Sequence, residues 1–368
     1  MNAVTQLQAG SILVMAGGTG GHVFPALSVA DVLRAEGWQV TWLGTRRGIE
    51  ARLVPAAGID IEWLDVSALR GKGVASLLLA PFKLLRACWQ AGRVIRRINP
   101  DVVLGMGGFA AGPGGLVAKL LGRPLVIHEQ NAVAGLTNRV LSKFADQVLV
   151  AFPGALSGRN VRSIGNPVRK DLQDIAPPEE RFAGRSGSLR LLVVGGSQGA
   201  RVLNEMLPAA LSLLDVDVTV RHQCGRDNAP MVEARYADAG IDASVEPFID
   251  DMAAAYAWAD LAICRAGAMT VFELATVGLG AVLVPYPHAV DDHQTANANY
   301  LAAVDAAEII REDSLDANSL AGSLRSHLGS RQDLLAMAVA ARGMAQPRAD
   351  RELAAVCAAL HDTAREAA

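Results

Sequence analysis

The sequence predicts an α/β protein made of two doubly wound parallel-sheet domains that face a cleft. Three observations support this fold class: a length of 368 residues, short apolar runs that alternate with helical patterns, and a glycine loop that recurs once in each half. A single hydrophobic core rarely grows beyond about 250–300 residues, so this length favours two domains. The recurring loops are "GGTGG" at 17–21 and "GGSQG" at 195–199, and each follows an apolar run and precedes a helical pattern.

Short apolar runs bounded by Gly, Pro or Asp are typical of buried parallel strands joined by crossover helices. In the first half we expect strands at 11–16, 39–43, 60–64, 101–105, 125–128, 147–150 and 161–164. In the second half we expect strands at 189–194, 217–222, 244–247, 260–264, 281–284 and 307–310. Both halves therefore predict a Rossmann-like domain, and ligands of such folds bind at the carboxyl ends of the strands.

The joint between the domains is predicted within "SIGNPVRKD" at 163–171, where Gly-Asn-Pro interrupts the pattern. We expect a first domain over residues 1–166 and a second over 167–344. Beyond residue 315 the chain is helical and rich in alanine. A C-terminal helix at about 345–368 could pack back on the first domain.

Composition excludes several classes of protein. Hydrophobic residues make up 51% of the chain and charged residues 19%, which is typical of a packed globular protein. The net charge of −3 argues against nucleic acid as a partner. Four separated cysteines without metal-ligand spacing indicate a reduced, cytoplasmic protein, and neither a signal sequence nor an apolar run of about 18 residues is present.

Four glycine-bearing loops follow predicted strands, at 17–21, 105–115, 195–199 and 264–273. The first matches neither G-x-G-x-x-G nor G-x-x-x-x-G-K-[ST]. Glycines still let backbone N–H groups approach an anion at a helix N-terminus, although a tight turn without a ligand is the alternative for any single loop. Four such loops at strand ends together predict a site for a phosphate-bearing ligand.

Several polar side chains stand beside these loops. His22 follows the first loop, and a histidine, with an ordinary pKa of about 6.5, suits a general base that takes a proton from an alcohol. His128, Glu129 and Asn131 end another strand, where a carboxylate could orient a histidine, bind sugar hydroxyls, or belong only to a helix-capping loop. The loop at 285–298 carries two His and two Asp, but their irregular spacing favours sugar hydroxyls over a metal ion.

Several motifs run in order from residue 17 to residue 298: "GGTGGHVFPALSVA", "GMGGFAAGPGG", "HEQNAVAGLTNRVL", "GNPVRKD", "GGSQGARVLNE", "FIDDMAAAYAWADLAICRAGAMTVFELA" and "VPYPHAVDDHQTANA". Together they resemble the MurG family of peptidoglycan N-acetylglucosaminyltransferases. The resemblance implies the glycosyltransferase-B fold and no required cofactor. It also implies inverting transfer of N-acetylglucosamine from UDP-N-acetylglucosamine to the 4-hydroxyl of the muramoyl sugar on undecaprenyl-pyrophosphate-linked muramoyl-pentapeptide.

The resemblance also implies roles for individual residues. His22 would be the catalytic base, with Glu129 close to the acceptor. Glu273 would bind the ribose, the backbone of Ile249 the uracil, and Ser197 with the helix that begins near Ala268 the diphosphate. Gln294 and Asn297 would read the sugar hydroxyls, and Phe272 replaces a small residue and is expected to tighten the nucleotide pocket. The full implied binding set is Thr19, Gly20, Gly21, Asn131, Arg169, Ser197, Ile249, Ala268, Met269, Thr270, Val271, Phe272, Glu273, Gln294 and Asn297.

A basic amphipathic segment at about Ser67–Arg97 predicts contact with a membrane surface. Residues 67–100 contain seven Lys or Arg and no acidic residue, with Leu77, Leu78, Leu79, Phe82, Leu85 and Trp89 between them. With the resemblance, this places the chain peripherally on the cytoplasmic face of the inner (plasma) membrane. An ordinary crossover helix is the alternative for the segment. For the whole chain, the alternatives are a soluble UDP-N-acetylglucosamine 2-epimerase and a non-catalytic nucleotide-sugar-binding regulator.

Overall fold

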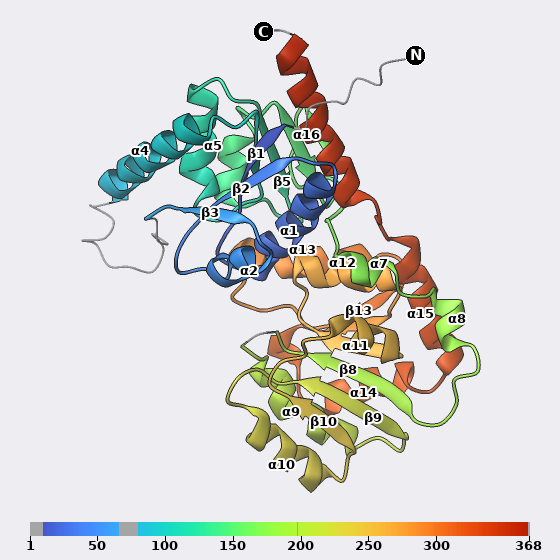
Figure 1. Ribbon diagram of the computed structural model, residues 1–368. Coiled ribbons are helices and arrows are strands. Elements are labelled where there is room, and N and C mark those ends of the chain that lie inside the picture. The colour runs from blue at the N-terminus through green and yellow to red at the C-terminus, as the bar shows by residue number, and fades with distance from the viewer. Residues whose placement is uncertain (1–9, 66–79, 197, 367–368) are drawn as a thin grey trace, which may run out of the picture. The chain divides into compact units, whose positions relative to one another are not determined.

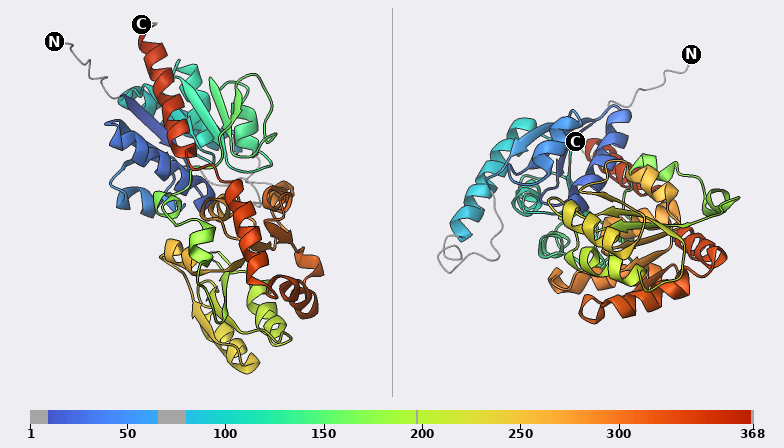
Figure 2. Two further views of the ribbon diagram at one scale, coloured as in Figure 1. Left: turned by 90° about the vertical axis from the view of Figure 1, so that its right-hand side faces the viewer. Right: turned by 90° about the horizontal axis from the view of Figure 1, so that it is seen from below.

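The computed structural model describes residues 10–65, 80–196 and 198–366 and divides into two compact units (Figure 1). Unit 1 comprises Met1–Arg169 and Arg348–Ala368, and unit 2 comprises Lys170–Pro347. Each unit contains one parallel β-sheet with helices on both faces (Figure 2). The predicted fold class of two parallel-sheet α/β domains is confirmed.

The sheet of unit 1 has seven parallel strands in the order β3-β2-β1-β4-β5-β6-β7. Their bounds are β1 Ser11–Met15, β2 Gln39–Gly44, β3 Asp60–Trp63, β4 Val102–Gly105, β5 Leu125–Glu129, β6 Gln147–Val150 and β7 Val161–Ser163. The strand order reverses between β1 and β4, which are directly paired. Loops that leave the carboxyl ends of two such strands diverge to opposite faces, so this is where a ligand or a reactive group is expected.

Helices cover both faces of this sheet. They are α1 Gly20–Ala35, α2 Glu50–Ala56, α4 Ala80–Ile98, α5 Ala111–Leu120, α6 Leu136–Leu141 and α16 Ala349–Glu366. On one face α1 packs with α16, whose Leu353, Ala354 and Cys357 enter the core. On the other face α4 packs with α5, and α5 packs with α6. The last helix of the chain therefore belongs to the first sheet and not to the second.

The sheet of unit 2 has six parallel strands in the order β10-β9-β8-β11-β12-β13. Their bounds are β8 Leu189–Val194, β9 Val218–Gln223, β10 Ala243–Glu246, β11 Leu261–Cys264, β12 Ala281–Leu283 and β13 Ala307–Ile309. The helices are α7 Lys170–Gln173, α8 Pro178–Phe182, α9 Arg201–Leu211, α10 Ala229–Ala239, α11 Met252–Trp258, α12 Ala268–Val277, η1 Val290–Asp292, α13 His293–Ala302, η2 Glu312–Ser314, α14 Ala317–His327 and α15 Arg331–Gly343.

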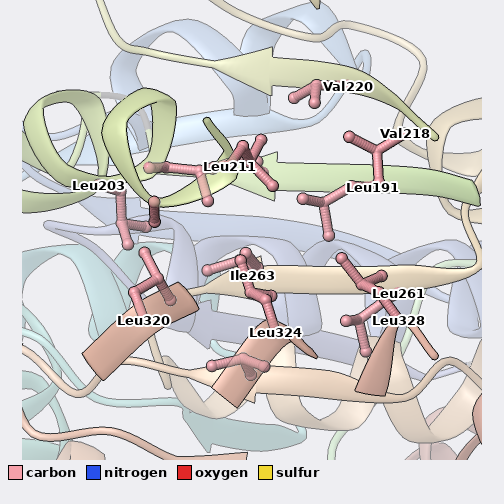
Figure 3. Packing of buried hydrophobic residues seen from close by; sticks show 14 of the residues in the cluster. Leu191, Leu203, Leu211, Val218, Val220, Leu261, Ile263, Leu320, Leu324 and Leu328 are labelled. Carbon is pink, nitrogen blue, oxygen red and sulfur yellow. The ribbon is translucent and has the colours of Figure 1, made fainter. Parts of the chain in front are cut away.

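One face of this second sheet shows why the apolar runs form buried strands. Figure 3 shows leucine, isoleucine and valine side chains of β8, β9 and β11 that meet leucines of the neighbouring helices α9 and α14. Most of these side chains are removed from water, at about 25 cal/mol for each Å² of apolar surface buried. This packing holds the carboxyl ends of β8, β9 and β11, from which the glycine loops of the unit leave.

Candidate active site

The loop after β1 is organised by a buried carboxylate. Gly18 N–H donates to Glu50 Oε2 at 2.9 Å, while the backbone N–H and the hydroxyl of Thr45 donate to Glu50 Oε1 at 3.0 and 2.7 Å. Glu50 has no exposed surface, and a Cβ on Gly17 would lie 2.6 Å from its Oε1. An amide that could have faced a ligand anion therefore already faces an anion of the protein. Sequence reasoning missed Glu50, which lies in α2 and far along the chain from the loop.

The glycine loop after β4 packs against the loop after β1. Gly107 and Gly108 have φ values of 97° and 84°, in the left-handed region that favours glycine. A Cβ on Gly108 would collide with the carbonyl of Gly17, and a Cβ on Gly107 would lie 2.9 Å from Cε1 and Nδ1 of the His22 ring. These glycines make room for a neighbouring backbone and for His22 itself.

His22 belongs to a chain of hydrogen bonds in unit 1. His22 lies in the first turn of α1, where its backbone N–H donates to the Thr19 carbonyl. Its Nδ1 lies 2.9 Å from Gln130 Oε1, Gln130 Nε2 lies 3.1 Å from His128 Nδ1, and His128 Nε2 lies 2.9 Å from the Gly165 carbonyl. His128 is fully buried, and this burial lowers its pKa to about 4. The partner of His22 is therefore an amide, Gln130, which sequence reasoning did not single out.

Glu129 is held by the loop that follows β5. Its carboxylate is almost fully buried and accepts hydrogen bonds from Asn131 N–H at 2.9 Å, Gly135 N–H at 3.1 Å and Asn138 Nδ2 at 2.9 Å. Glu129 thus shapes the loop between β5 and α6. The expectation that Glu129 lies close to the acceptor stays a prediction, since these hydrogen bonds show only how its carboxylate is held.

The remaining unit 1 residues of the implied set surround this loop. Thr19 is exposed at the N-cap of α1, and Gly20 and Gly21 form the first residues of that helix. The guanidinium of Arg169 lies 5.8 Å from the centre of the Phe24 ring, also on α1. The structure therefore brings Thr19, Gly20, Gly21 and Arg169 to the same helix that carries His22.

In unit 2 the loop after β8 packs against the loop after β9. Gly199 and Gly225 both have positive φ, and a Cβ on either would collide with the backbone of the other loop. Ser197, which the resemblance implies as a diphosphate ligand, lies outside the described residues. These glycines therefore let the two loops pack closely at the carboxyl ends of the paired strands β8 and β9, the edge where ligands of such folds bind.

The N-terminus of α12 suits an anion. Gly267 is its N-cap and brings no side chain to the first backbone N–H groups, which are those of Ala268, Met269 and Thr270. These groups and the helix dipole favour a phosphate at this end. The side chains of Ala268, Met269 and Val271 are buried, so the first turn offers a ligand mainly backbone. This end of α12 is the candidate diphosphate site.

Three other residues of the implied donor set, Ile249, Glu273 and Gln294, have defined partners. The hydroxyl of Tyr256 donates to Glu273 Oε2 at 3.0 Å, and Ile249 N–H donates to Gln223 Oε1 at 3.0 Å. Gln294 Oε1 accepts from Tyr286 N–H at 2.9 Å, which holds the loop after β12.

Two further residues of unit 2 are buried. Asn297 has no exposed surface, and its Nδ2 donates to the Ala266 carbonyl at 3.2 Å, which holds the loop before α12; its contact with a sugar hydroxyl stays a prediction. Phe272 is also fully buried and stacks on Tyr300 of α13, with ring centres 5.0 Å apart. Phe272 therefore fills the packing between two helices, and its effect on a nucleotide pocket stays a prediction.

In the described part of the chain, no group of three or more His, Cys, Asp or Glu side chains is placed to hold a metal ion. Asp251, one of the paired aspartates at 250–251, caps α11 by accepting from Ala254 N–H at 2.8 Å. Asp291 and Asp292 both adopt left-handed backbone conformations in the turn before α13. One aspartate of each pair, Asp251 and Asp292, thus accepts a hydrogen bond in the first turn of the helix that follows it.

The basic amphipathic segment is described from residue 80 onward, and residues 66–79 lie outside the described residues. On α4, Ala87, Ala91 and Ile95 are buried, whereas Phe82, Leu85 and Trp89 are 69%, 67% and 61% exposed. Helix α4 thus packs on the domain as a crossover helix does and also exposes large apolar side chains, and its contact with a membrane stays a prediction. The neighbouring helices α5 and α6 add Leu116, Leu120, Leu136 and Val140 as exposed apolar side chains.

Among the helices that the structure describes, none combines the length and the apolar character needed to cross a bilayer.

Comparison with known proteins identifies the family. The glycosyltransferase family 28 N-terminal domain matches residues 12–150, and the family 28 C-terminal domain matches residues 190–353. A relative from Burkholderia pseudomallei (strain 1106a), named UDP-N-acetylglucosamine--N-acetylmuramyl-(pentapeptide) pyrophosphoryl-undecaprenol N-acetylglucosamine transferase, is 55% identical over 95% of this chain and 96% of its own. The chain belongs to the MurG family. Its resemblance to that family is confirmed.

Solved structures agree with the MurG assignment. The crystal structure of Acinetobacter baumannii MurG is 45% identical, with a TM-score of 0.83 over 95% of this chain and 99% of that one. A putative UDP-N-acetylglucosamine 2-epimerase from Listeria monocytogenes has a TM-score of 0.66 but only 15% identity, and this likeness shows the fold alone. The MurG family, and not the epimerases, therefore accounts for both the sequence and the glycosyltransferase-B fold.

Proposed function

We propose that this chain transfers N-acetylglucosamine from UDP-N-acetylglucosamine to the 4-hydroxyl of the muramoyl sugar on undecaprenyl-pyrophosphate-linked muramoyl-pentapeptide. The anomeric carbon is inverted, no cofactor takes part, and UDP is the second product. The name and the 55% identity of the Burkholderia relative support this reaction. The observation that carries the chemistry is the hydrogen bond of His22. Its ring, in the first turn of α1 after β1, is held by Gln130 on the loop after β5.

In this reaction the acceptor hydroxyl gives its proton to His22. The oxygen then bonds to the anomeric carbon on the face opposite the diphosphate, and the carbon–oxygen bond to UDP breaks with its electron pair. The leaving diphosphate gains negative charge, which the backbone N–H groups at the start of α12 would stabilise by preorganised electrostatics. Glu273 would accept hydrogen bonds from the ribose hydroxyls beside this helix end.

Replacing His22 tests the base directly. We expect His22→Ala to lower kcat for lipid-dependent UDP release at least 100-fold, the low end of general-base effects, and to leave the Kd for UDP-N-acetylglucosamine within about threefold. His327→Ala is the matched control, because His327 is a partly exposed histidine at the end of α14 in unit 2 and pairs with Glu308 of β13. Unchanged turnover in His22→Ala would remove His22 from the base role. Formation of UDP-N-acetylmannosamine from the donor alone would instead favour epimerase chemistry.

The lipid-linked acceptor requires access to a bilayer. We place the chain peripherally on the cytoplasmic face of the plasma membrane through the apolar face of α4, which we define as Phe82, Leu85 and Trp89. Lys83, Arg86 and Arg93 stand among these residues on the same helix, and each cation near anionic lipid contributes about 1 kcal/mol. Apolar side chains that enter the interface add burial energy to this attraction.

Vesicle binding tests this surface. The triple variant Phe82→Ser, Leu85→Ser and Trp89→Ser should bind anionic phospholipid vesicles at least 10-fold more weakly than wild type. Full burial of each apolar side chain would otherwise contribute about 1.5–3 kcal/mol to the binding free energy. Leu213→Ser with Met231→Ser is the matched control, since both residues are exposed and apolar in unit 2. Equal binding of the triple variant and the wild type would refute the membrane role of α4.

A further inference from the structure

Gln130 lies between two histidines, and its hydrogen bonds fix where the protons are. The chain of contacts runs from the Gly165 carbonyl through His128 and Gln130 to His22, over distances of 2.9, 3.1 and 2.9 Å. All four residues belong to unit 1. Because a carbonyl only accepts and an amide has one donating and one accepting end, the donor at each contact follows from the one before it.

The assignment begins at Gly165. Its carbonyl oxygen can only accept, so His128 Nε2 must carry the hydrogen that it donates. His128 has no exposed surface, and burial lowers its pKa to about 4, so the ring is neutral near pH 7. A neutral ring with its hydrogen on Nε2 has a lone pair on Nδ1. His128 therefore presents an acceptor to Gln130.

Gln130 is fixed by two acceptors at once. Its Nε2 lies 3.1 Å from His128 Nδ1 and 3.2 Å from the His128 carbonyl. A flipped amide would set its oxygen against both acceptors, so the orientation follows from chemistry and not only from coordinates. The side chain is buried, and Asn166 Nδ2 donates to the backbone carbonyl of Gln130 at 3.0 Å. Oε1 of Gln130 is therefore the atom that faces His22.

We propose that Gln130 and His128 are positioning residues that hold His22 in the tautomer with its hydrogen on Nδ1, which leaves Nε2 as the basic atom. The inference rests on the proposed function in taking His22 as the base. When His22 Nε2 receives the acceptor proton, Nδ1–H keeps its hydrogen bond to Gln130 Oε1. An amide oxygen is not a base near pH 7, so the proton stays on His22 until it leaves to solvent.

The neutral partner has a further consequence. A carboxylate at position 130 would favour the charged form of His22, because an opposite charge within hydrogen-bond distance stabilises an imidazolium. The base must be neutral before it can accept a proton. Gln130→Glu should therefore move the acidic limb of the kcat/KM profile to higher pH by about one unit or more. A residue that only filled space would not change the profile in this direction.

The tautomer can be read without any substrate. Protein labelled with ring-¹⁵N histidine, with His22 assigned by the signal lost in His22→Gln, should show the neutral His22 ring with its hydrogen on Nδ1. Gln130→Met keeps a similar volume but offers neither donor nor acceptor, and it should give a mixture of both tautomers. Wild-type protein with the hydrogen on Nε2, or Gln130→Met with an unchanged Nδ1–H ring, would overturn the inference.

Kinetics provide the second readout. Gln130→Met should lower kcat about 10- to 100-fold, since a poorly oriented group of this kind costs up to about 10²-fold, while KM for UDP-N-acetylglucosamine stays within about twofold. His222→Phe is the matched control: it removes another fully buried histidine, from unit 2, and should leave the pH profile unshifted. If Gln130→Glu shows the wild-type acidic limb, the positioning role is refuted.

The two proposals fail in distinguishable ways. If the wild-type protein releases no UDP with the lipid-linked acceptor, the proposed function is wrong, yet the nitrogen spectra still decide the His22 tautomer. If the wild-type protein turns over normally and Gln130→Met matches it in kcat and in tautomer, only the role of Gln130 and His128 is wrong. Circular dichroism of each variant at the assay temperature separates loss of fold from loss of positioning.

Discussion

Unit 2 should lose stability in mild acid because of one buried histidine. His222 on β9 has no exposed surface, and its Nε2 lies 3.1 Å from Asn204 Oδ1. Asn204 Nδ2 donates to the Cys224 carbonyl, so Oδ1 is the accepting end and His222 Nε2 carries a hydrogen. The Tyr236 hydroxyl lies 2.9 Å from Nδ1, and burial raises the pKa of Tyr236, so this hydroxyl keeps its hydrogen and donates it. The neutral ring is therefore fully paired, and a second proton would break this pairing.

The size of the effect follows from linkage. Burial lowers the pKa of His222 to about 4, whereas a histidine in an unfolded chain has a pKa of about 6.5. Between these values the unfolded state binds the proton and the folded state does not, so stability falls as the pH drops through this window. The difference between the two pKa values corresponds to about 3.4 kcal/mol in the free energy of unfolding. Lowering the pH from 8 to 5 should lower that free energy by about 2 kcal/mol.

Hydrogen exchange measured by mass spectrometry can isolate this contribution. The opening free energy of peptides from β9 is compared at pH 8 and pH 5 in wild type and in His222→Phe, after correction for intrinsic exchange. The variant should be less stable at pH 8, and its loss on going to pH 5 should be about 2 kcal/mol smaller than that of wild type. Equal losses in the two proteins, or a His222 ring that protonates above pH 6 by NMR, would refute the reasoning.

Three further predictions concern the site. Glu50→Gln should lower the free energy of unfolding by about 1–3 kcal/mol in urea titrations, because the donors of Gly18 and Thr45 lose an acceptor. It should also lower kcat, because this loop leads into the first turn of α1, which carries His22. Unchanged values of both would contradict the role of Glu50. Phe272→Ala should cost about 3–5 kcal/mol of stability without strengthening UDP binding in calorimetry, and tighter binding would support a pocket role. Dialysis against EDTA should leave UDP release within about twofold, and a 10-fold gain on adding MgCl₂ would show that a metal takes part.

The strands were predictable to within about two residues because their sequence signal is local. In β8 the run Leu189–Val194 is apolar apart from Arg190, and it ends at the pair Gly195 and Gly196. A buried parallel strand needs this composition along its whole length, and its end needs residues that turn sharply. The expected crossover pattern then follows from strand spacing alone.

The contacts of the site were harder to predict, since they join distant segments. The hydrogen bond between Gly18 and Glu50 joins the loop after β1 to the helix after β2. No periodicity in the sequence indicates that this carboxylate contacts the first loop. The Gln130 contact was easier to predict from the sequence. Side chains alternate along a strand, so His128 and Gln130 are expected on one face at the end of β5 and Glu129 on the other. Attention to charge selected Glu129, whereas the two-residue period points to Gln130.

The contrast between Glu50 and the start of α12 explains why two similar glycine loops can serve different chemistry. A loop whose amides are unsatisfied attracts an anion, and in a protein that handles a diphosphate each such loop competes for it. In unit 1 the Gly18 amide is already satisfied by Glu50, and the added negative charge disfavours a phosphate there. In unit 2 Gly267 leaves the first turn of α12 without a side-chain cap. Glu50 therefore takes one amide of the unit 1 loop out of anion binding. This amide, and not a helix cap, distinguishes that loop from the start of α12, because neither α1 nor α12 has a side-chain N-cap hydrogen bond.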